Sequence, residues 1–111
     1  MKKINMAVLI TCHNRIQKTQ TCLKSLFNQK KIENINLKVF LVDDGSVDGT
    51  KEHVNINFPQ VNLIDGNGQL YWGGGTFLAW ETALEDNIEY DYFLWVNDDT
   101  FLFEDAISIL L

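Results

Sequence analysis

The chain has 111 residues, of which 46% are hydrophobic and 22% are charged, and these values are ordinary for one folded domain. Nine basic and fifteen acidic residues give a net charge of −6, which disfavours nucleic-acid binding because a phosphate backbone requires clustered Lys and Arg. The apolar run from Met6 to Ile10 is too short for a signal peptide. No stretch approaches the roughly 20 apolar residues of a transmembrane helix. We therefore expect neither nucleic-acid binding nor a membrane-spanning segment in these residues.

The first predicted unit is a buried strand over Met6 to Ile10, followed by a helix. Polar residues 11–15 connect the two, and Asn14 is in position to cap the helix. Apolar side chains then recur at helical spacing through residue 27. Cys12 and Cys22 lack metal-type spacing, so we expect reduced cytosolic thiols that contribute to packing.

The second and third units are shorter. A strand over residues 37–42 leads into a turn with Gly45 and Gly49, after which Ser46 or Asp48 can cap a helix that ends near residue 58. A third strand is expected over residues 61–64 and is followed by a turn-rich loop.

Bulky aromatic residues next to three consecutive glycines mark the start of the last part of the chain. The run from Leu70 to Gly75 predicts a tight bend or a close approach to a ligand. A helix is expected from Thr76 to about residue 87, with an anion site at its N-terminus, and its packing face is predicted to comprise Phe77, Trp80 and Leu84.

The fourth strand, residues 92–96, is an uninterrupted apolar run that favours burial on both faces. It leads into Asn97, Asp98 and Asp99. Two adjacent carboxylates repel each other, and a divalent cation with oxygen ligands relieves that repulsion. A solvated acidic turn is the alternative interpretation. The final helix is expected over residues 104–111.

This alternation of strands and helices predicts an α/β fold, with a mostly parallel open sheet, right-handed crossovers and helices on both faces. Ligands of such sheets bind beyond the carboxyl ends of the strands. Polar clusters follow three of the four strands at this edge, at residues 11–15, 43–46 and 97–99. One acidic cluster can hold a nucleoside, and the other can hold a metal ion on its phosphates. No glycine triplet of the dinucleotide type follows the first strand.

These clusters resemble the three signatures of a known enzyme family. Residues 11–15 (Thr-Cys-His-Asn-Arg), 42–49 (Val-Asp-Asp-Gly-Ser-Val-Asp-Gly) and 97–99 (Asn-Asp-Asp) are similar to the nucleotide-binding half of family 2 inverting glycosyltransferases with the Rossmann-like GT-A fold. The loop over residues 66–75 looks most like the bacterial rhamnosyltransferase-like branch. The resemblance covers essentially the whole chain. It implies that residues 1–111 form the donor-binding part of a truncated GT-A domain, without the acceptor-binding half.

The resemblance also assigns roles to individual residues. It implies that Thr11 and His13 lie beside the nucleobase and that Asp44 accepts a hydrogen bond from it. Asp98 would contact the ribose or the sugar, and Asp99 would ligate manganese or magnesium on the diphosphate. The implied nucleotide-binding set is Thr11, His13, Asn14, Arg15, Asp43, Asp44, Gly45, Ser46, Gly74 and Asp98, and the implied metal ligands are Asp99 and Asp98.

The implied reaction transfers a sugar, with inversion, from a nucleotide-diphosphate donor to a hydroxyl of a glycan or lipid-linked acceptor in polysaccharide synthesis. Inversion requires a general base, which the resemblance places beyond residue 111. We therefore expect no catalytic residue here and no activity from this part alone. The implied location is the cytoplasm, and a peripheral position at the inner face of the membrane is compatible with it.

Two other function classes remain open. A nucleotidyltransferase that makes sugar nucleotides shares the sheet and the metal chemistry, but it would be expected to have a Gly-rich loop with Arg after the first strand, and residues 11–15 contain no glycine. A non-catalytic nucleotide-binding module would bind without turnover. We also expect self-association into homo-oligomers, because Ile107, Leu110 and Leu111 would lack cover.

Overall fold

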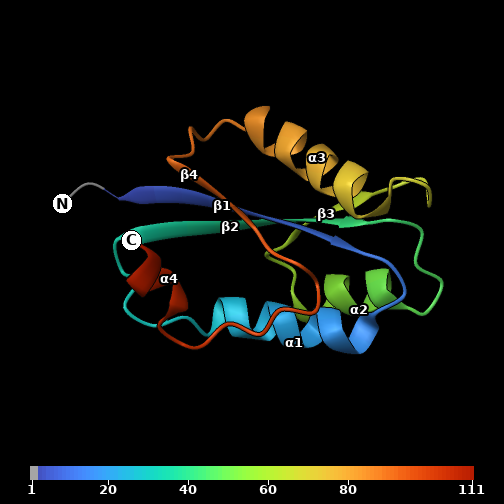
Figure 1. Ribbon diagram of the computed structural model, residues 1–111, viewed down its shortest axis with the longest axis horizontal. Helices are drawn as coiled ribbons and strands as arrows, with labels where there is room; N and C mark the ends of the chain where they lie inside the picture. The colour runs from blue at the N-terminus through green and yellow to red at the C-terminus, as the bar shows by residue number, and fades with distance from the viewer. Residues whose placement is uncertain (1–2) are drawn as a thin grey trace.

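The computed structural model describes residues 3–111, and Figure 1 shows strands and helices alternating along this part of the chain. The elements, in order, are β1 (Ile4–Cys12), α1 (Ile16–Phe27), β2 (Ile35–Asp43), α2 (Thr50–Asn57), β3 (Asn62–Asp65), α3 (Tyr71–Leu84), β4 (Tyr92–Trp95) and α4 (Ala106–Leu110). The predicted order of elements is therefore confirmed.

The four strands form one parallel sheet in the order β3-β2-β1-β4. β1 and β2 pair in register from Ile4 with Ile35 to Cys12 with Asp43. The connection from β1 leads to β2 on one side, whereas β4 pairs with the other side of β1. The direction of the strand order therefore reverses at β1, which is where ligands bind in open α/β sheets. The predicted α/β fold with a parallel sheet and helices on both faces is confirmed.

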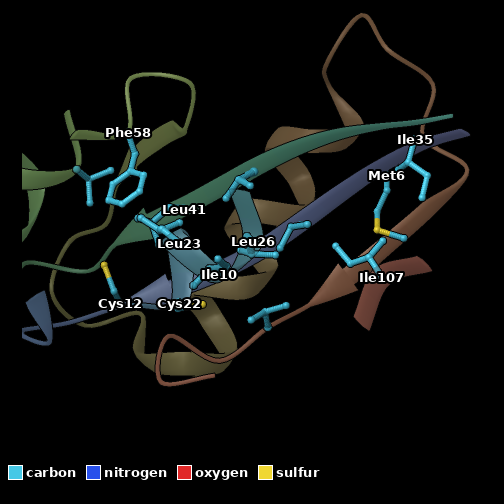
Figure 2. Packing of buried hydrophobic residues seen from close by; sticks show 14 residues of the cluster. Met6, Ile10, Cys12, Cys22, Leu23, Leu26, Ile35, Leu41, Phe58 and Ile107 are labelled. Atoms are coloured by element: carbon cyan, nitrogen blue, oxygen red, sulfur yellow. The ribbon is translucent and has the colours of Figure 1, made fainter. Parts of the chain in front are cut away.

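Alternate residues of β1 face two different cores. Met6, Val8, Ile10 and Cys12 belong to the core under α1, α2 and α4, part of which Figure 2 shows. Ala7 and Leu9 point to the opposite face, where they pack under α3. In Figure 1, α3 accordingly lies on one side of the sheet, and the other three helices lie on the other side.

Helix α3 differs from the prediction in both its start and its packing face. It begins at Tyr71, so the three glycines lie in its first turns. Its buried residues are Gly75, Thr76, Ala79 and Ala83, whereas Phe77 is 52% exposed. Of the three bulky residues predicted to form the packing face, Leu84 is also exposed, at 59%, and only Trp80 packs against the core. Small residues face the sheet because the helix lies close to it.

Strand β4 was expected to be buried on both faces, and this expectation was wrong. Tyr92 and Trp95 are about half exposed, at 49% and 50%. β4 is an edge strand, so in this segment only Leu94 and, directly after the strand, Val96 belong to the core under α1. Aromatic composition therefore indicated a strand correctly but did not reveal its place in the sheet.

Helix α4 covers the core with a single side chain. Ile107 is fully buried, so the expectation that it lacks cover was wrong, whereas Leu110 is 61% exposed. Gln29 fixes the helix, since its Oε1 accepts a hydrogen bond of 2.9 Å from the N–H of Ile107. Self-association stays a prediction. None of the helices within residues 3–111 is long and apolar enough to cross a membrane.

Candidate functional site

A pocket of about 270 Å³ opens at the carboxyl ends of β1 and β2. It lies at the point where the direction of the strand order reverses, and side chains from four separate segments surround it. The lining residues are Thr11, Cys12, His13, Arg15, Asp44, Gly68, Tyr71, Trp72 and Asp98. Five of the predicted site residues, Thr11, His13, Arg15, Asp44 and Asp98, therefore meet in one cavity.

Asp44 organises the loop between β3 and α3. Its Oδ1 accepts hydrogen bonds from the N–H groups of Gly68 at 2.8 Å and Leu70 at 3.3 Å, and its Oδ2 accepts one from Tyr71 at 2.9 Å. Asp44 is 2% exposed, and its carboxylate lies at the N-terminus of α3, where the helix dipole favours a negative charge. The anion site expected at Thr76 is therefore displaced to Tyr71, and a side chain of the protein itself occupies it.

Asp43, Gly45 and Ser46 form the turn behind the pocket rather than its lining. Asp43 Oδ1 accepts a hydrogen bond of 3.1 Å from the N–H of Ser46. Gly45 has a φ of +76°, and a Cβ there would lie 2.8 Å from the Cα of Gly68. Glycine is required at this position because the two loops touch through their backbones.

The imidazole of His13 is held at both nitrogens. The N–H of Val47 donates to Asn14 Oδ1 at 2.7 Å, which turns Asn14 Nδ2 toward His13 Nε2 at 3.2 Å. Nε2 therefore accepts, and Nδ1 carries the proton that it donates to the carbonyl of Asp44 at 2.6 Å. This network fixes the ring at the wall of the pocket.

Asn14 does not cap helix α1, contrary to expectation. Its φ is +51°, and its side chain bonds to the neighbouring loop instead. The N–H of Ile16 donates to Asp48 Oδ2 at 3.1 Å, and the other carboxylate oxygen of Asp48 accepts a hydrogen bond of 3.1 Å from the N–H of Thr50. The Asp48 carboxylate thus stabilises the starts of both α1 and α2, whereas the sequence predicted this role for α2 alone.

The first turns of α3 pack directly on Thr11. The Thr11 and Thr76 hydroxyls are 3.1 Å apart, and a Cβ on Gly75 would lie 2.9 Å from the Cβ of Thr11. Gly75 therefore permits close contact between helix and strand. The N–H of Gly74 donates to the carbonyl of Leu70 at 3.1 Å, so this amide is engaged within the helix, and a contact between Gly74 and a nucleotide stays a prediction.

The two adjacent acidic residues differ in environment. The Asp98 side chain is 9% exposed and lines the pocket, whereas Asp99 is 47% exposed and borders a neighbouring hollow with Lys18. Burial raises the pKa of Asp98, and the guanidinium of Arg15, 3.4 Å away, opposes that rise. Arg15 also lies 3.7 Å from Asp99.

These carboxylates supply hard oxygen ligands of the kind that Mn²⁺ and Mg²⁺ bind. Residues 3–111 contain no cluster of three or more His, Cys, Asp or Glu arranged to hold a metal ion. Two carboxylates fit a cation that takes its other ligands from a bound diphosphate and water, as magnesium does in phosphate-binding sites.

Trp72 joins α3 to the acidic segment, a contact that the sequence analysis missed. Its Nε1 donates to Asn97 Oδ1 at 2.6 Å, and its ring lies edge-on to Trp95, with the centroids 6.1 Å apart. Tyr71 beside it has a φ of +59°, an uncommon conformation for a bulky residue. The only sequence signal was the position of both aromatic residues directly before the glycines.

Both cysteines are free and buried, as expected. Burial, reinforced by the nearby Asp43 and Asp98, raises the pKa of the Cys12 thiol far above its ordinary value. Burial also raises the pKa of Cys22 to about 12. The thiols are therefore protonated and serve for packing, although Cys12 also lines the pocket.

The sequence profile of the family described as Glycosyl transferase family 2 matches residues 7–111. None of the curated proteins matches the chain.

Several solved structures share the fold. Residues 1–349 of TarS from S. aureus superpose with a TM-score of 0.72 at 22% identity, covering 99% of this chain and 31% of that one. TarS has also been solved with UDP-GlcNAc, with a TM-score of 0.71 and 23% identity over 99% of this chain and 30% of that one. The mannosyltransferase PcManGT from Pyrobaculum calidifontis, solved with GDP-Man and Mn²⁺, has a TM-score of 0.72 at 18% identity, covering 97% of this chain and 31% of its own. The chain thus spans about a third of the length of these structures.

Proposed function

The chain belongs to glycosyl transferase family 2, and from this membership we propose that residues 1–111 form the donor-binding part of a GT-A glycosyltransferase. The observation that carries the proposal is the pocket at the carboxyl end of the sheet, which gathers His13, Asp44 and Asp98 from three different strand ends. The donor is a nucleotide-diphosphate sugar, in line with the UDP-GlcNAc and GDP-Man bound by the similar structures.

In this proposal the nucleobase lies between His13 and the loop that Asp44 holds. A carboxylate has about four lone-pair sites, and three backbone N–H groups use Asp44 already. One site remains for a donor group of the base, and the fixed ring of His13 provides a flat wall. Tyr71 and Trp72 at the mouth of the pocket supply apolar surface for the base or the sugar.

Asp98 and Asp99 would hold a manganese or magnesium ion on the diphosphate. The bound ion would act as a Lewis acid that stabilises the charge developing on the leaving nucleoside diphosphate. The residues of this chain contribute the rest: Asp98 approaches the sugar side of the pocket, and Arg15 supplies positive charge beside the phosphates. Asn97 fixes Trp72 through its side chain.

We propose an inverting transfer to the hydroxyl of a glycan or lipid-linked acceptor, as in the rhamnosyltransferase-like branch, with polysaccharide assembly at the inner face of the membrane as the setting. The acceptor site and the general base would then come from the acceptor-binding half. This part alone would bind the donor without transferring sugar.

Calorimetric titration with UDP, dTDP and GDP, each with and without Mn²⁺, tests the proposal. We expect one nucleotide to bind with a marked dependence on Mn²⁺, and Asp99→Asn to reduce that binding at least tenfold. Glu33→Gln is the matched control, because it removes one exposed carboxylate charge just before β2 begins, whereas the pocket lies at the opposite, carboxyl end of that strand.

Failure of all three nucleotides to bind to folded protein, in this chain and in a longer one that includes the acceptor half, would refute the proposal. Binding that is the same in Asp99→Asn and Glu33→Gln would refute the metal-ligand role of Asp99. Binding of a nucleoside triphosphate and a sugar phosphate, with pyrophosphate release, would instead select the nucleotidyltransferase.

A further inference from the structure

Arg15 is the only arginine in the sequence, and its guanidinium lies within ion-pair distance of both acidic residues that the proposed function assigns to the metal ion. The same nitrogen, Nη1, is 3.4 Å from Asp98 Oδ1 and 3.7 Å from Asp99 Oδ2. One positive charge is thus shared between two adjacent carboxylates. This contact offsets one of the two negative charges of the acidic pair.

The ion pairs that Arg15 forms with Asp98 and Asp99 are easily broken. Both distances are long for charge-assisted hydrogen bonds, which are usually 2.7–2.9 Å, and the Arg15 side chain is 50% exposed. Ion pairs of this kind contribute little free energy because water screens them and the side chain loses entropy. A competing cation or anion can therefore replace these ion pairs at a small cost in free energy.

The two carboxylates differ in their exposure to solvent, and the more buried one gains more from a nearby cation. Asp98 is nearly buried, whereas Asp99 is half exposed. Lys18 is a second basic residue in this region, since it borders the same hollow as Asp99. Within residues 3–111, only Arg15 lies within ion-pair distance of both acids. The charge of Arg15 is therefore the one that a divalent cation would have to displace.

We propose that Arg15 is an exchangeable counter-cation, which occupies Asp98 and Asp99 in the free protein and turns to the diphosphate when a metal-bound nucleotide enters the pocket. This inference rests on the proposed function and adds a positioning role for one residue. A guanidinium suits both partners, because its planar set of N–H donors matches carboxylates and phosphates alike. Arg15 also lines the pocket, so a ligand that fills the pocket would lie next to its side chain.

The exchange couples metal binding to nucleotide binding. Arg15 opposes the metal ion when no nucleotide is present, and it supports the complex once the diphosphate has arrived. Because coupling between two ligands is reciprocal, the nucleotide raises metal affinity by the same factor by which the metal raises nucleotide affinity. Removal of Arg15 should therefore change the two affinities in opposite directions.

Titration of Mn²⁺ into the protein, followed by the electron paramagnetic resonance signal of the free ion, measures the first affinity without any enzymatic turnover. We expect Arg15→Gln to bind Mn²⁺ about tenfold more tightly than the wild type, as two partly exposed ion pairs would predict. Lys18→Gln is the matched control: it removes the same charge from the same region, and we expect a change of less than threefold.

Calorimetric titration of Mn²⁺-saturated protein with UDP and GDP measures the second affinity. We expect Arg15→Gln to bind the better nucleotide about tenfold more weakly, and Arg15→Lys to fall between Arg15→Gln and the wild type. Far-ultraviolet circular dichroism and urea unfolding establish that the variants are folded.

Three results would overturn the inference: Mn²⁺ affinity of Arg15→Gln that is equal to or weaker than that of the wild type, an equal change in Lys18→Gln, or no measurable Mn²⁺ binding in any variant. A different pattern of Mn²⁺ and nucleotide binding would show that the proposed function is wrong while the role of Arg15 as a counter-cation holds. If Arg15→Gln binds Mn²⁺ more tightly but no nucleotide binds to any form of the protein, Arg15 still competes for the acidic pair and the donor-site assignment is wrong.

Discussion

Gly75→Ala and Gly73→Ala should change stability in opposite directions, although both glycines lie in the first turns of α3. A Cβ on Gly75 would lie 2.5 Å from Thr11 Oγ1 and 2.9 Å from Thr11 Cβ, whereas a Cβ on Gly73 meets nothing within 4 Å. In a helix, Ala is favoured over Gly by about 1 kcal/mol. Overpacking costs about 3 kcal/mol when the obstructing atoms belong to a buried strand residue.

The expected net effect is a loss of about 2 kcal/mol for Gly75→Ala and a gain of up to about 1 kcal/mol for Gly73→Ala. Urea unfolding followed by circular dichroism measures both values. The displaced helix should also carry Trp72 away from Asn97, which the tryptophan fluorescence of the folded variant would report. A Gly75→Ala variant as stable as the wild type would refute the packing argument, because the helix would then not need to touch Thr11.

Two further predictions follow from buried and paired groups. Cys12 and Cys22 should not react with a disulfide reagent at pH 8 in the folded protein, because burial raises the pKa of Cys22 to about 12 and also raises the pKa of Cys12. Both thiols should react once the protein is unfolded in guanidinium. Rapid reaction of the native protein would contradict this prediction. The hydrogen bonds from Lys38 and Tyr90 lower the pKa of Asp86 from 3.8 to about 2, so their stabilisation is present above pH 4 and lost as the pH falls through 2. The urea midpoint of Asp86→Asn should then fall less between pH 4 and pH 2 than that of the wild type, and parallel curves would show that Asp86 does not contribute.

The sequence was sufficient for the order of the elements because each signal is local. The strands coincide with short apolar runs bounded by turn residues, and α1 follows from apolar residues at helical spacing. The carboxyl ends of parallel strands necessarily share one edge, so the meeting of His13, Asp44 and Asp98 in one pocket also followed from strand order. No knowledge of distant contacts was needed for these conclusions.

The start of α3 could not be predicted in the same way. Three consecutive glycines disfavour a helix, yet α3 includes them because the carboxylate of Asp44 accepts the N–H of Tyr71, and because Gly75 fits against Thr11. These partners are 27 and 64 residues apart in the sequence. Local propensity was therefore overruled by long-range contacts.

The environment of each apolar or charged side chain was decided by tertiary structure as well. The sequence determined that residues 92–95 form a strand and that Asp98 and Asp99 follow it. Only the folded sheet placed that strand at an edge, exposed Trp95, and brought Arg15 against both acids. Burial and electrostatic pairing depend on which segments become neighbours in space, and a single sequence encodes that choice only through the packing of the whole chain.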